Sequence, residues 1–290
     1  MSELKSRLFL LLQKLLPRLA LTALVFRLAR IRTTGIKNFF IRQFVGIYKV
    51  NVEEVKQSVP DDFATFNDFF IRELVASARP IDAASESIVS PADGTVSAAG
   101  KIDRDRIFQA KGLHYTLTDL LATDIDDATR FVDGAFATIY LSPSDYHRVH
   151  SPVSGELIAA RYVPGDLFSV NEATVAYLPN LFTRNERLIC HLQTVNGPIV
   201  VILVGALNVG SINTRWSGDL RPRKKGVVDN IDIATKGEST QLKKGDLIGW
   251  FNMGSTVIVL LPPGSSDELS TLKTGSRVRM GQAIGSMKKV

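Results

Sequence analysis

The chain has 290 residues, a length that fits one large domain or two small ones and is sufficient to bury a substantial core. Apolar residues make up 45% of the sequence and charged residues 22%, which excludes a disordered chain, a collagen and a small disulfide scaffold. The single cysteine, Cys190, excludes an internal disulfide and any metal site built from several cysteines.

The net charge of +6 is unevenly distributed. Residues 1–50 contain ten lysines and arginines and one acid, Glu3, so they carry +9, and the other 240 residues must carry −3. A protein that binds nucleic acid usually spreads basic charge over its folded body. Basic charge confined to an apolar N-terminal segment instead favours an anionic membrane surface as the partner, with no nucleic acid.

Residues 8–31 are rich in leucine but are interrupted by four basic residues. The longest uncharged stretch, residues 19–26, is eight residues long. A membrane-spanning helix needs about 20 predominantly apolar residues, so we expect no transmembrane helix here. A signal peptide is also a poor fit, because no clean apolar core ends in a small-residue cleavage site.

Helical spacing places Arg7, Lys14 and Arg18 on one face, and leucines cover much of the remainder. Pro17 is expected to end or kink this helix, and a second basic helix is expected over residues 36–50. We therefore predict that residues 1–75 form a basic, amphipathic, membrane-associating helical region. The alternative is a helical layer whose leucines pack against the protein's own core.

From about residue 88 the pattern changes to short strand-like runs between turns. Asn196-Gly197 separates two such runs and is a strong hairpin signal, and residues 257–261 form a continuous apolar strand. We predict an α+β fold, in which the N-terminal amphipathic helices precede a mostly antiparallel β sandwich or barrel-like catalytic domain over residues 76–290.

Two histidines, His147 and His150, lie in a segment bracketed by Pro143 and Pro152. A loop that holds two imidazoles at fixed positions suits proton transfer. The alternative is a pair of exposed loop histidines. A zinc site at this pair would lack a third ligand, so no metal is predicted.

Asp93 and Ser255 each look like an ordinary turn residue when taken alone. Together with a histidine they stand in the order Asp, His, Ser, which is typical of a charge-relay set. The nucleophile elbow of the α/β-hydrolases is excluded, because Met253 and Val257 occupy the positions where that motif requires glycine.

Gly254, directly before Ser255, suggests a different use of the serine. A serine hydroxyl can attack the carbonyl of its own preceding peptide bond, in a backbone geometry that glycine tolerates because it lacks Cβ. A histidine accepts the hydroxyl proton, and an ester forms in the backbone. Elimination then breaks the chain, and the dehydroalanine end hydrolyses to a pyruvoyl group.

Several separated segments in consistent order span about residues 45–265. They are residues 69–72, 79–81, 91–94, 145–150, 162–171, 180–182 and 254–256. As a set they closely resemble the pyruvoyl-dependent phosphatidylserine decarboxylases of the bacterial type. The cleavage motif of that family is Leu-Gly-Ser-Thr, and Met253 replaces the leucine with an apolar side chain of similar volume.

The resemblance implies self-cleavage between Gly254 and Ser255, with Ser255 converted to a pyruvoyl group that serves as the covalent cofactor. It assigns Asp93, His150 and Ser255 to the charge relay for cleavage. It assigns His147 to proton transfer during decarboxylation.

The resemblance also implies a carboxy-lyase activity. The pyruvoyl carbonyl would form a Schiff base with the serine amine of phosphatidylserine, carbon dioxide would leave, and phosphatidylethanolamine would be released. Because the substrate is a membrane lipid, we expect a peripheral protein at the cytoplasmic face of the inner membrane. The two chains made by cleavage are expected to stay associated, and the family allows a homodimer.

Five further residues are candidate substrate contacts. Tyr162, Leu167 and Phe168 flank a glycine turn and are predicted to line the entrance for the lipid; the alternative is a buried turn. Arg72 and Arg79 are predicted to meet the lipid phosphate, with surface ion pairs as the alternative.

Three other interpretations remain open from the residues themselves. A Ser-His-Asp hydrolase acting on lipid esters or peptides would use the same residues without cutting its own chain. A lipoyl or biotinyl carrier domain is suggested by the similar turns at residues 245–249 and 281–285. A passive membrane-bound scaffold would leave the histidine loop unexplained.

Overall fold

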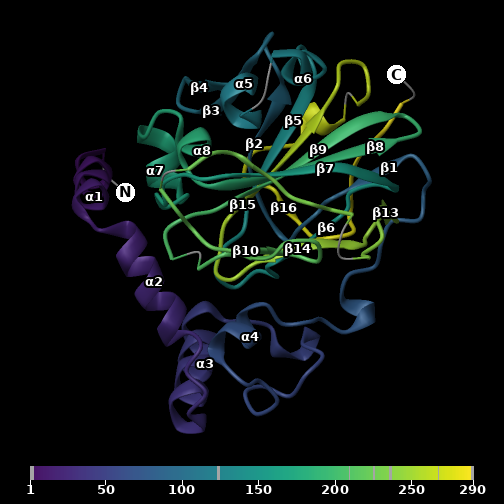
Figure 1. The fold of residues 1–290 in the computed structure, drawn as a ribbon. Helices are drawn as coiled ribbons and strands as arrows, with labels where there is room; N and C mark the ends of the chain where they lie inside the picture. Colours follow the sequence, from purple (N-terminus) through teal and green to yellow (C-terminus); the bar gives the residue numbers. More distant parts are fainter. Residues whose placement is uncertain are drawn as a thin grey trace.

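The computed structural model describes residues 3–122, 125–208, 210–224, 226–234, 237–266 and 268–288. N-terminal helices precede a body of antiparallel β-sheets (Figure 1). This arrangement confirms the predicted α+β fold. Within the described ranges the sheets form no closed barrel.

The chain begins with α1 (Glu3–Leu15), α2 (Arg18–Leu28) and α3 (Thr34–Tyr48). Pro17 ends the first helix as predicted, and α1 and α2 meet at an angle of 83°. The prediction that Arg18 shares a face with Arg7 and Lys14 is wrong. The break at Pro17 places Arg18 in the first turn of α2, where it is buried and pairs with Asp166 at 2.7 Å.

No single helix in the described part of the chain has both the length and the apolar composition of a membrane span. Only α1 and α2 taken together reach that composition, across their sharp bend.

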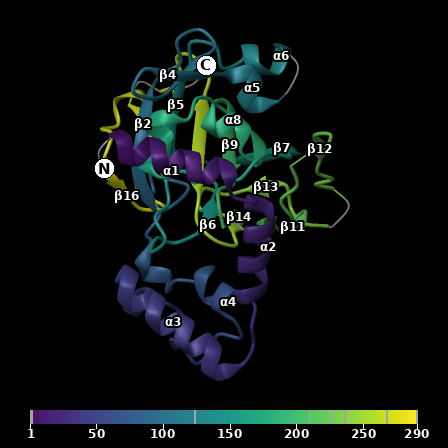
Figure 2. The same ribbon diagram turned by 90° about the vertical axis from the view of Figure 1, so that its left-hand side faces the viewer.

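A cluster of phenylalanines joins α3 to the short helix α4 (Phe66–Phe70). The ring of Phe44 on α3 meets three rings of α4 edge-on, at centroid distances of 5.2 Å (Phe66), 6.3 Å (Phe69) and 5.8 Å (Phe70). We call these four residues and Phe63 the phenylalanine cluster. Both ribbon views show α3 and α4 at one end of the β body, whereas α1 lies along its side against α7 (Glu172–Tyr177) (Figures 1 and 2).

The main sheet is antiparallel throughout. Its strands run in the order β12 (Asp229–Asn230), β7 (Gly155–Val163), β8 (Arg187–Thr194), β9 (Gly197–Val204), β15 (Thr256–Leu261), β5 (Ala135–Tyr140), β2 (Gly94–Lys101) and β16 (Arg277–Val278), and β13 (Gln241–Leu242) also pairs with β7. The hairpin predicted at Asn196-Gly197 is confirmed as β8–β9.

A second sheet packs beside the first. Its order is β11 (Gly218–Leu220), β10 (Ile212–Thr214), β14 (Leu247–Phe251) and β6 (Arg148–His150). Two further pairs are β1 (Ser87–Val89) with β17 (Ala283–Ser286), and β3 (Arg106–Ala110) with β4 (Leu113–Thr116). The remaining short helices are α5 (Leu117–Leu121), α6 (Ile125–Thr129) and α8 (Leu181–Arg184), with 3-10 turns at Val52–Glu54, Ala76–Ala78 and Leu269–Thr271.

The two similar glycine turns precede strands, as expected of a turn-and-strand unit. Gly245 precedes β14 and Gly281 precedes β17, and both have positive φ angles, 89° and 85°. A Cβ at either position would come within 3.0 Å of Ile81, so the absence of a side chain lets both turns close over the same residue.

The centre of the core is β15, which pairs with β9 on one side and β5 on the other. All six of its residues are buried, which explains why this run is apolar throughout instead of alternating. The boundary predicted between residues 75 and 76 falls in the connection from α4 to β1, and the division into domains stays a prediction.

Replacing Leu260 in β15 with alanine should lower the free energy of unfolding by about 2–5 kcal/mol, because the side chain is fully buried and leaves a cavity. Leu12→Ala on α1 removes the same atoms from a side chain that is 54% exposed, and should change stability by at most about 0.5 kcal/mol. Urea unfolding of both variants measures the difference. Equal losses would contradict the position of the core in β15.

Candidate functional site

Ser255 lies at one end of the main sheet, directly before β15. Its carbonyl oxygen accepts a hydrogen bond of 2.8 Å from the backbone N–H of Leu141, which extends the pairing of β15 with β5 by one residue. The Ser255 hydroxyl is completely buried and has no hydrogen-bond partner in the described part of the chain. An unpaired buried hydroxyl is costly, and its persistence here marks Ser255 as a candidate reacting group.

His147 lies beside the bond that precedes Ser255. Its Nδ1 carries the proton and donates to the carbonyl oxygen of Asp145 at 2.8 Å, which leaves Nε2 with a free lone pair. Nε2 is buried without a partner, and a Cβ built on Gly254 would lie 3.4 Å from it. The ring also packs on Phe70 of α4, with centroids 4.1 Å apart.

The electrostatic setting of His147 keeps the ring neutral. Burial, and then the positive charge of Arg72, lower the imidazole pKa to about 3 against the opposing effect of Asp145. A neutral imidazole with a free Nε2 beside Gly254 is placed to exchange a proton with a reacting group at this turn.

His150 lies on β6 and has both ring nitrogens occupied. Nδ1 donates to the carbonyl oxygen of Gly245 at 2.8 Å, and Nε2 accepts from the hydroxyl of Tyr146 at 3.0 Å. Burial lowers its pKa to about 4, while the negative charge of Asp93 acts in the opposite direction. His150 is therefore also neutral, and its charged form would be stabilised by Asp93.

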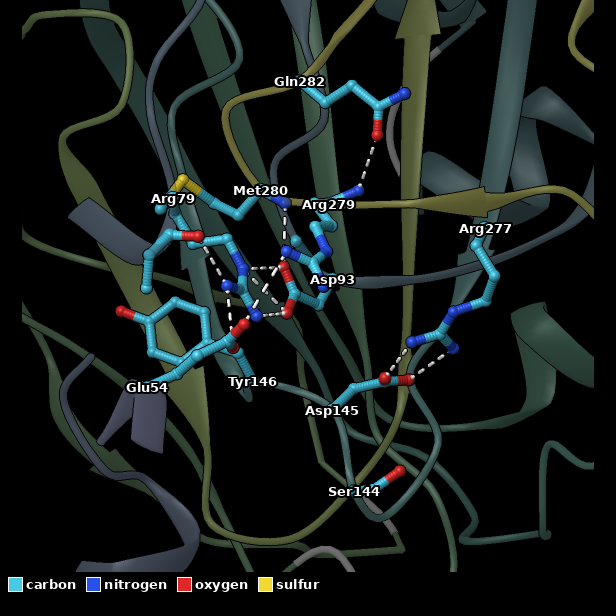
Figure 3. Close-up of polar contacts among 12 residues, drawn as sticks. Glu54, Arg79, Asp93, Ser144, Asp145, Tyr146, Arg277, Arg279, Met280 and Gln282 are labelled. Carbon is cyan, nitrogen blue, oxygen red and sulfur yellow. Dashed lines mark hydrogen bonds and ion pairs between the residues drawn. The ribbon is translucent and has the colours of Figure 1, made fainter. Parts of the chain in front are cut away.

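Asp93, just before β2, is held by Arg79 and by the backbone (Figure 3). Nε of Arg79 donates to Oδ1 at 2.8 Å, and the backbone N–H of Met280 donates to the same oxygen at 2.9 Å. Arg79 also pairs with Glu54 at 2.9 Å. These contacts hold a buried carboxylate in place. Its negative charge favours the protonated form of His150.

The three predicted relay residues are thus brought into one region, but no direct hydrogen bond among the described residues joins Asp93, His150 and Ser255. His147 is the imidazole next to the candidate bond. The roles assigned to all four residues stay predictions.

A cleft of about 190 Å³ opens at the Gly254 turn. Helix α3, helix α4 and the segment before α7 contribute to its wall. The lining residues are Phe44, Tyr48, Phe70, Tyr140, Pro143, Ser169, Val170, Asn171, Ala206, Leu207, Asn208, Met253 and Gly254. An apolar groove of about 290 Å³ adjoins it between α2, α3 and α4, and shares Phe44, Tyr48 and Met253 with the cleft.

Tyr162, Leu167 and Phe168 are buried and do not line this cleft, although Ser169 follows them directly and does. The hydroxyl of Tyr162 instead donates to Glu186 at 2.6 Å. Their predicted contact with the lipid stays a prediction.

The two arginines predicted to meet phosphate already have protein partners. Arg72 donates to the carbonyl oxygen of Ser144 at 2.8 Å, and Arg79 holds Asp93 and Glu54. Both therefore organise the loops around the site, and their contact with phosphate stays a prediction.

Glu186 is the buried acid that sequence reasoning missed. It lies directly before β8 and against Gly205, and burial raises its carboxyl pKa to about 8. One oxygen accepts from Tyr162, and the other has no partner among the described residues. The signal available in the sequence was an acid directly before an apolar strand-like run, which alone does not distinguish a buried side chain from an exposed one.

Among the described residues, no three histidine, cysteine, aspartate or glutamate side chains are grouped so that they could hold a metal ion.

A family model described as phosphatidylserine decarboxylase matches residues 66–286, and a second, described as PSD, matches residues 8–49. Similar curated proteins carry the name phosphatidylserine decarboxylase proenzyme. One from Alcanivorax borkumensis is 48% identical over 98% of this chain and 97% of its own length, and one from Chromobacterium violaceum is 47% identical over 97% and 99%. One from Saccharophagus degradans is 44% identical over 98% of both chains. These matches confirm the family resemblance found in the sequence.

The buried neutral histidines should make stability fall in acid. The pKa of each is lower in the folded chain (about 3 and about 4) than its ordinary value near 6.5, so the unfolded chain binds more protons between these values. The contribution of these two histidines to the free energy of unfolding should be constant above about pH 6.5 and decline as pH falls toward 4, while Glu186, with its pKa raised to about 8, contributes in the opposite sense over the range below pH 8. His147→Gln and His150→Gln should each flatten that decline in urea titrations at several pH values.

The control is His114→Gln on the β3–β4 hairpin, which should leave the acid decline as it is in the wild type. An unchanged slope in both His147→Gln and His150→Gln would show that these rings are not buried in the neutral form.

Proposed function

The chain belongs to the phosphatidylserine decarboxylase family and is a decarboxylase, and we propose that it converts phosphatidylserine to phosphatidylethanolamine through a pyruvoyl group made from its own Ser255. The observation that carries the proposal is the turn before β15. There a buried, unpaired serine hydroxyl follows a glycine that lies beside the free Nε2 of a neutral histidine.

The self-cleavage begins at the Gly254–Ser255 peptide bond. The Ser255 hydroxyl attacks the Gly254 carbonyl carbon and gives up its proton, the C–N bond breaks, and an ester replaces the amide. Removal of the Ser255 α-proton expels the Gly254 carboxylate and leaves dehydroalanine. Addition of water and loss of ammonia then leave the pyruvoyl group at residue 255. Asp93 and His150 are proposed to drive proton transfer in this sequence.

The residues around Ser255 fit the group that would form there. A pyruvoyl group supplies an electrophilic carbonyl that accepts the electron pair released with carbon dioxide. The carbonyl of residue 255 is conjugated to that group, and the N–H of Leu141 already donates to its oxygen, so negative charge developing there is stabilised. His147, the imidazole next to the bond, is proposed to take up a proton from solvent at its free Nε2 and to deliver it in place of the lost carboxylate.

Intact mass of the freshly purified protein under denaturing conditions tests the cofactor. We expect two chains, residues 1–254 and residues 255–290, with the shorter one beginning in pyruvoyl. Ser255→Ala should remain one chain, since it lacks the attacking hydroxyl. Release of carbon dioxide from phosphatidylserine by the cleaved protein, and not by the alanine variant, confirms the substrate. A single mass that persists on incubation would contradict the pyruvoyl mechanism and favour the hydrolase.

Single substitutions separate the two histidines. We expect His150→Gln and Asp93→Asn to remain uncleaved, and His147→Gln to cleave but to release carbon dioxide at least about 100-fold more slowly, the usual contribution of a positioned acid or base. An uncleaved His147→Gln beside a cleaved His150→Gln would reverse the assignment.

We also propose that α1 and α3 lie on an anionic membrane, at the cytoplasmic face of the inner membrane. On α1 few leucines face the protein: the buried residues are Ser6, Leu10 and Gln13, and Gln13 donates to Thr174 at 3.0 Å. The exposed side is formed by Leu4, Leu8, Leu11, Leu12, Leu15 and Leu16. Leucines turned outward on a basic helix support an interfacial role, and argue against a layer packed on the protein's own core.

On α3 apolar side chains lie on both the buried and the exposed face, with Ile41 fully buried. Lys37 is buried and donates to the carbonyl oxygen of Pro60 at 3.1 Å, whereas Phe39 and Ile47 are 58% and 68% exposed. Because the apolar groove opens between α2 and α3, a bilayer at this surface would lie next to the groove that leads to Met253. Figure 2 shows α1, α2 and α3 following one another along one side of the molecule.

Binding to vesicles tests the surface. The protein should sediment with vesicles that contain phosphatidylglycerol, less so at high salt, since lysines and arginines contribute. The double variant Leu8→Ser, Leu12→Ser should bind vesicles about tenfold or more weakly, because it lacks two leucine side chains that would be buried in the bilayer. Val195→Ser on the β8–β9 hairpin, also an exposed apolar residue (93%), is the matched control and should bind normally. Equal loss in both variants would refute the surface.

A further inference from the structure

The backbone directly before the candidate cleavage bond has an unusual conformation. Met253 has a φ of 152°, whereas the other non-glycine residues with positive φ in the described chain lie between 46° and 69°, in ordinary left-handed turns. Residues with a Cβ avoid the region that Met253 occupies, which is populated essentially by glycine. Such strain persists only where the surroundings hold the residue in place.

The chain on both sides of Met253 is fixed. Asn252, which precedes it, is buried; its Nδ2 donates to the hydroxyl of Ser211 at 2.6 Å, and its Oδ1 accepts from Asn67 of α4 at 3.0 Å. On the other side, Ser255 is bound to Leu141 and leads into β15. The turn therefore has little freedom to relax by moving its ends.

The Met253 side chain is held as well. It packs against the phenylalanine cluster and lines both the cleft and the apolar groove, together with Phe44. The helical layer thus contacts the turn at two adjacent residues, at Asn252 through Asn67 and at Met253 through the phenylalanines. A thioether side chain suits this role, because it fills irregular space between aromatic rings.

We propose that Met253 is a positioning residue for self-cleavage: its side chain, anchored in the phenylalanine cluster, holds the peptide before Gly254 in a strained conformation that bond cleavage releases. The inference rests on the proposed function and adds the source of the strain and the element that maintains it. Strain present before the reaction and absent afterwards lowers the barrier to the step that relieves it. The α3–α4 layer accordingly takes part in maturation.

Three substitutions at one position separate anchoring from strain. Leucine keeps both the Cβ and an apolar anchor, alanine keeps the Cβ but loses the anchor, and glycine loses both. We expect Met253→Leu to cleave at the wild-type rate and Met253→Ala to cleave more slowly. Met253→Gly should be slowest, about tenfold or more below wild type, the effect expected when a backbone strain of this kind no longer assists the step. The rates are measured by following the two chains during cell-free synthesis.

The stability of the uncleaved chain toward urea distinguishes backbone strain at Met253 from a purely structural role of its side chain. In a Ser255→Ala background, Met253→Gly should unfold at a higher urea concentration than Met253→Ala, because glycine adopts the observed φ without strain. At an ordinary φ the order is reversed, since glycine loses more entropy on folding. Strain therefore predicts that the glycine variant is the more stable and the slower of the two.

The inference is overturned if Met253→Gly cleaves as fast as Met253→Ala, or is no more stable than it. Anchoring is overturned if Met253→Ala cleaves at the wild-type rate. Failure of the wild-type chain to cleave at all would instead refute the proposed function, which keeps the two tests distinct.

Discussion

The position of β15 between β5 and β9 is the constraint on which the site depends. Backbone pairing on both sides fixes this strand, and on the β5 side the pairing extends to Ser255. Gly254 and Met253 lie just outside it, in a turn whose conformation side chains from other elements determine. A rigid strand next to a strained turn places the Ser255 hydroxyl and the peptide bond that we propose it attacks in a defined relationship.

The helical N-terminal part, which we propose lies on a membrane, also contacts the residues of the candidate site. Two residues of α4 contact the site: Phe70 packs on His147, and Asn67 donates a hydrogen bond to Asn252. Arg72, two residues after α4, donates to the carbonyl oxygen of Ser144 in the loop that precedes the histidines. The same helix packs on Phe44 of α3, whose other side is exposed and apolar. A surface suited to lipid and a loop that carries the imidazoles thus share one phenylalanine cluster.

Local chemistry made some of this predictable from the sequence. The hairpin at Asn196-Gly197 and the break at Pro17 follow from residues that act on their own backbone, and the continuous apolar run predicted β15. Long-range partners could not be predicted in this way. Helical spacing predicts Arg18 on one face with Arg7 and Lys14, whereas its partner Asp166 is 148 residues away. The pairing of Arg79 with Asp93 likewise cannot be predicted from the spacing.

Cleavage before β15 would divide a sheet whose strands are interleaved. The shorter chain would contribute β15 to the middle of the main sheet, β16 beside β2 and β17 beside β1, so it could leave only if the larger chain came apart. Once separated, the two pieces would have to meet by diffusion, because the covalent link that kept them at high effective concentration would be gone. The mature protein would then be easy to form once and difficult to restore. Heat or denaturant would end the working life of each molecule, and the cell could replace it only by synthesising a new precursor.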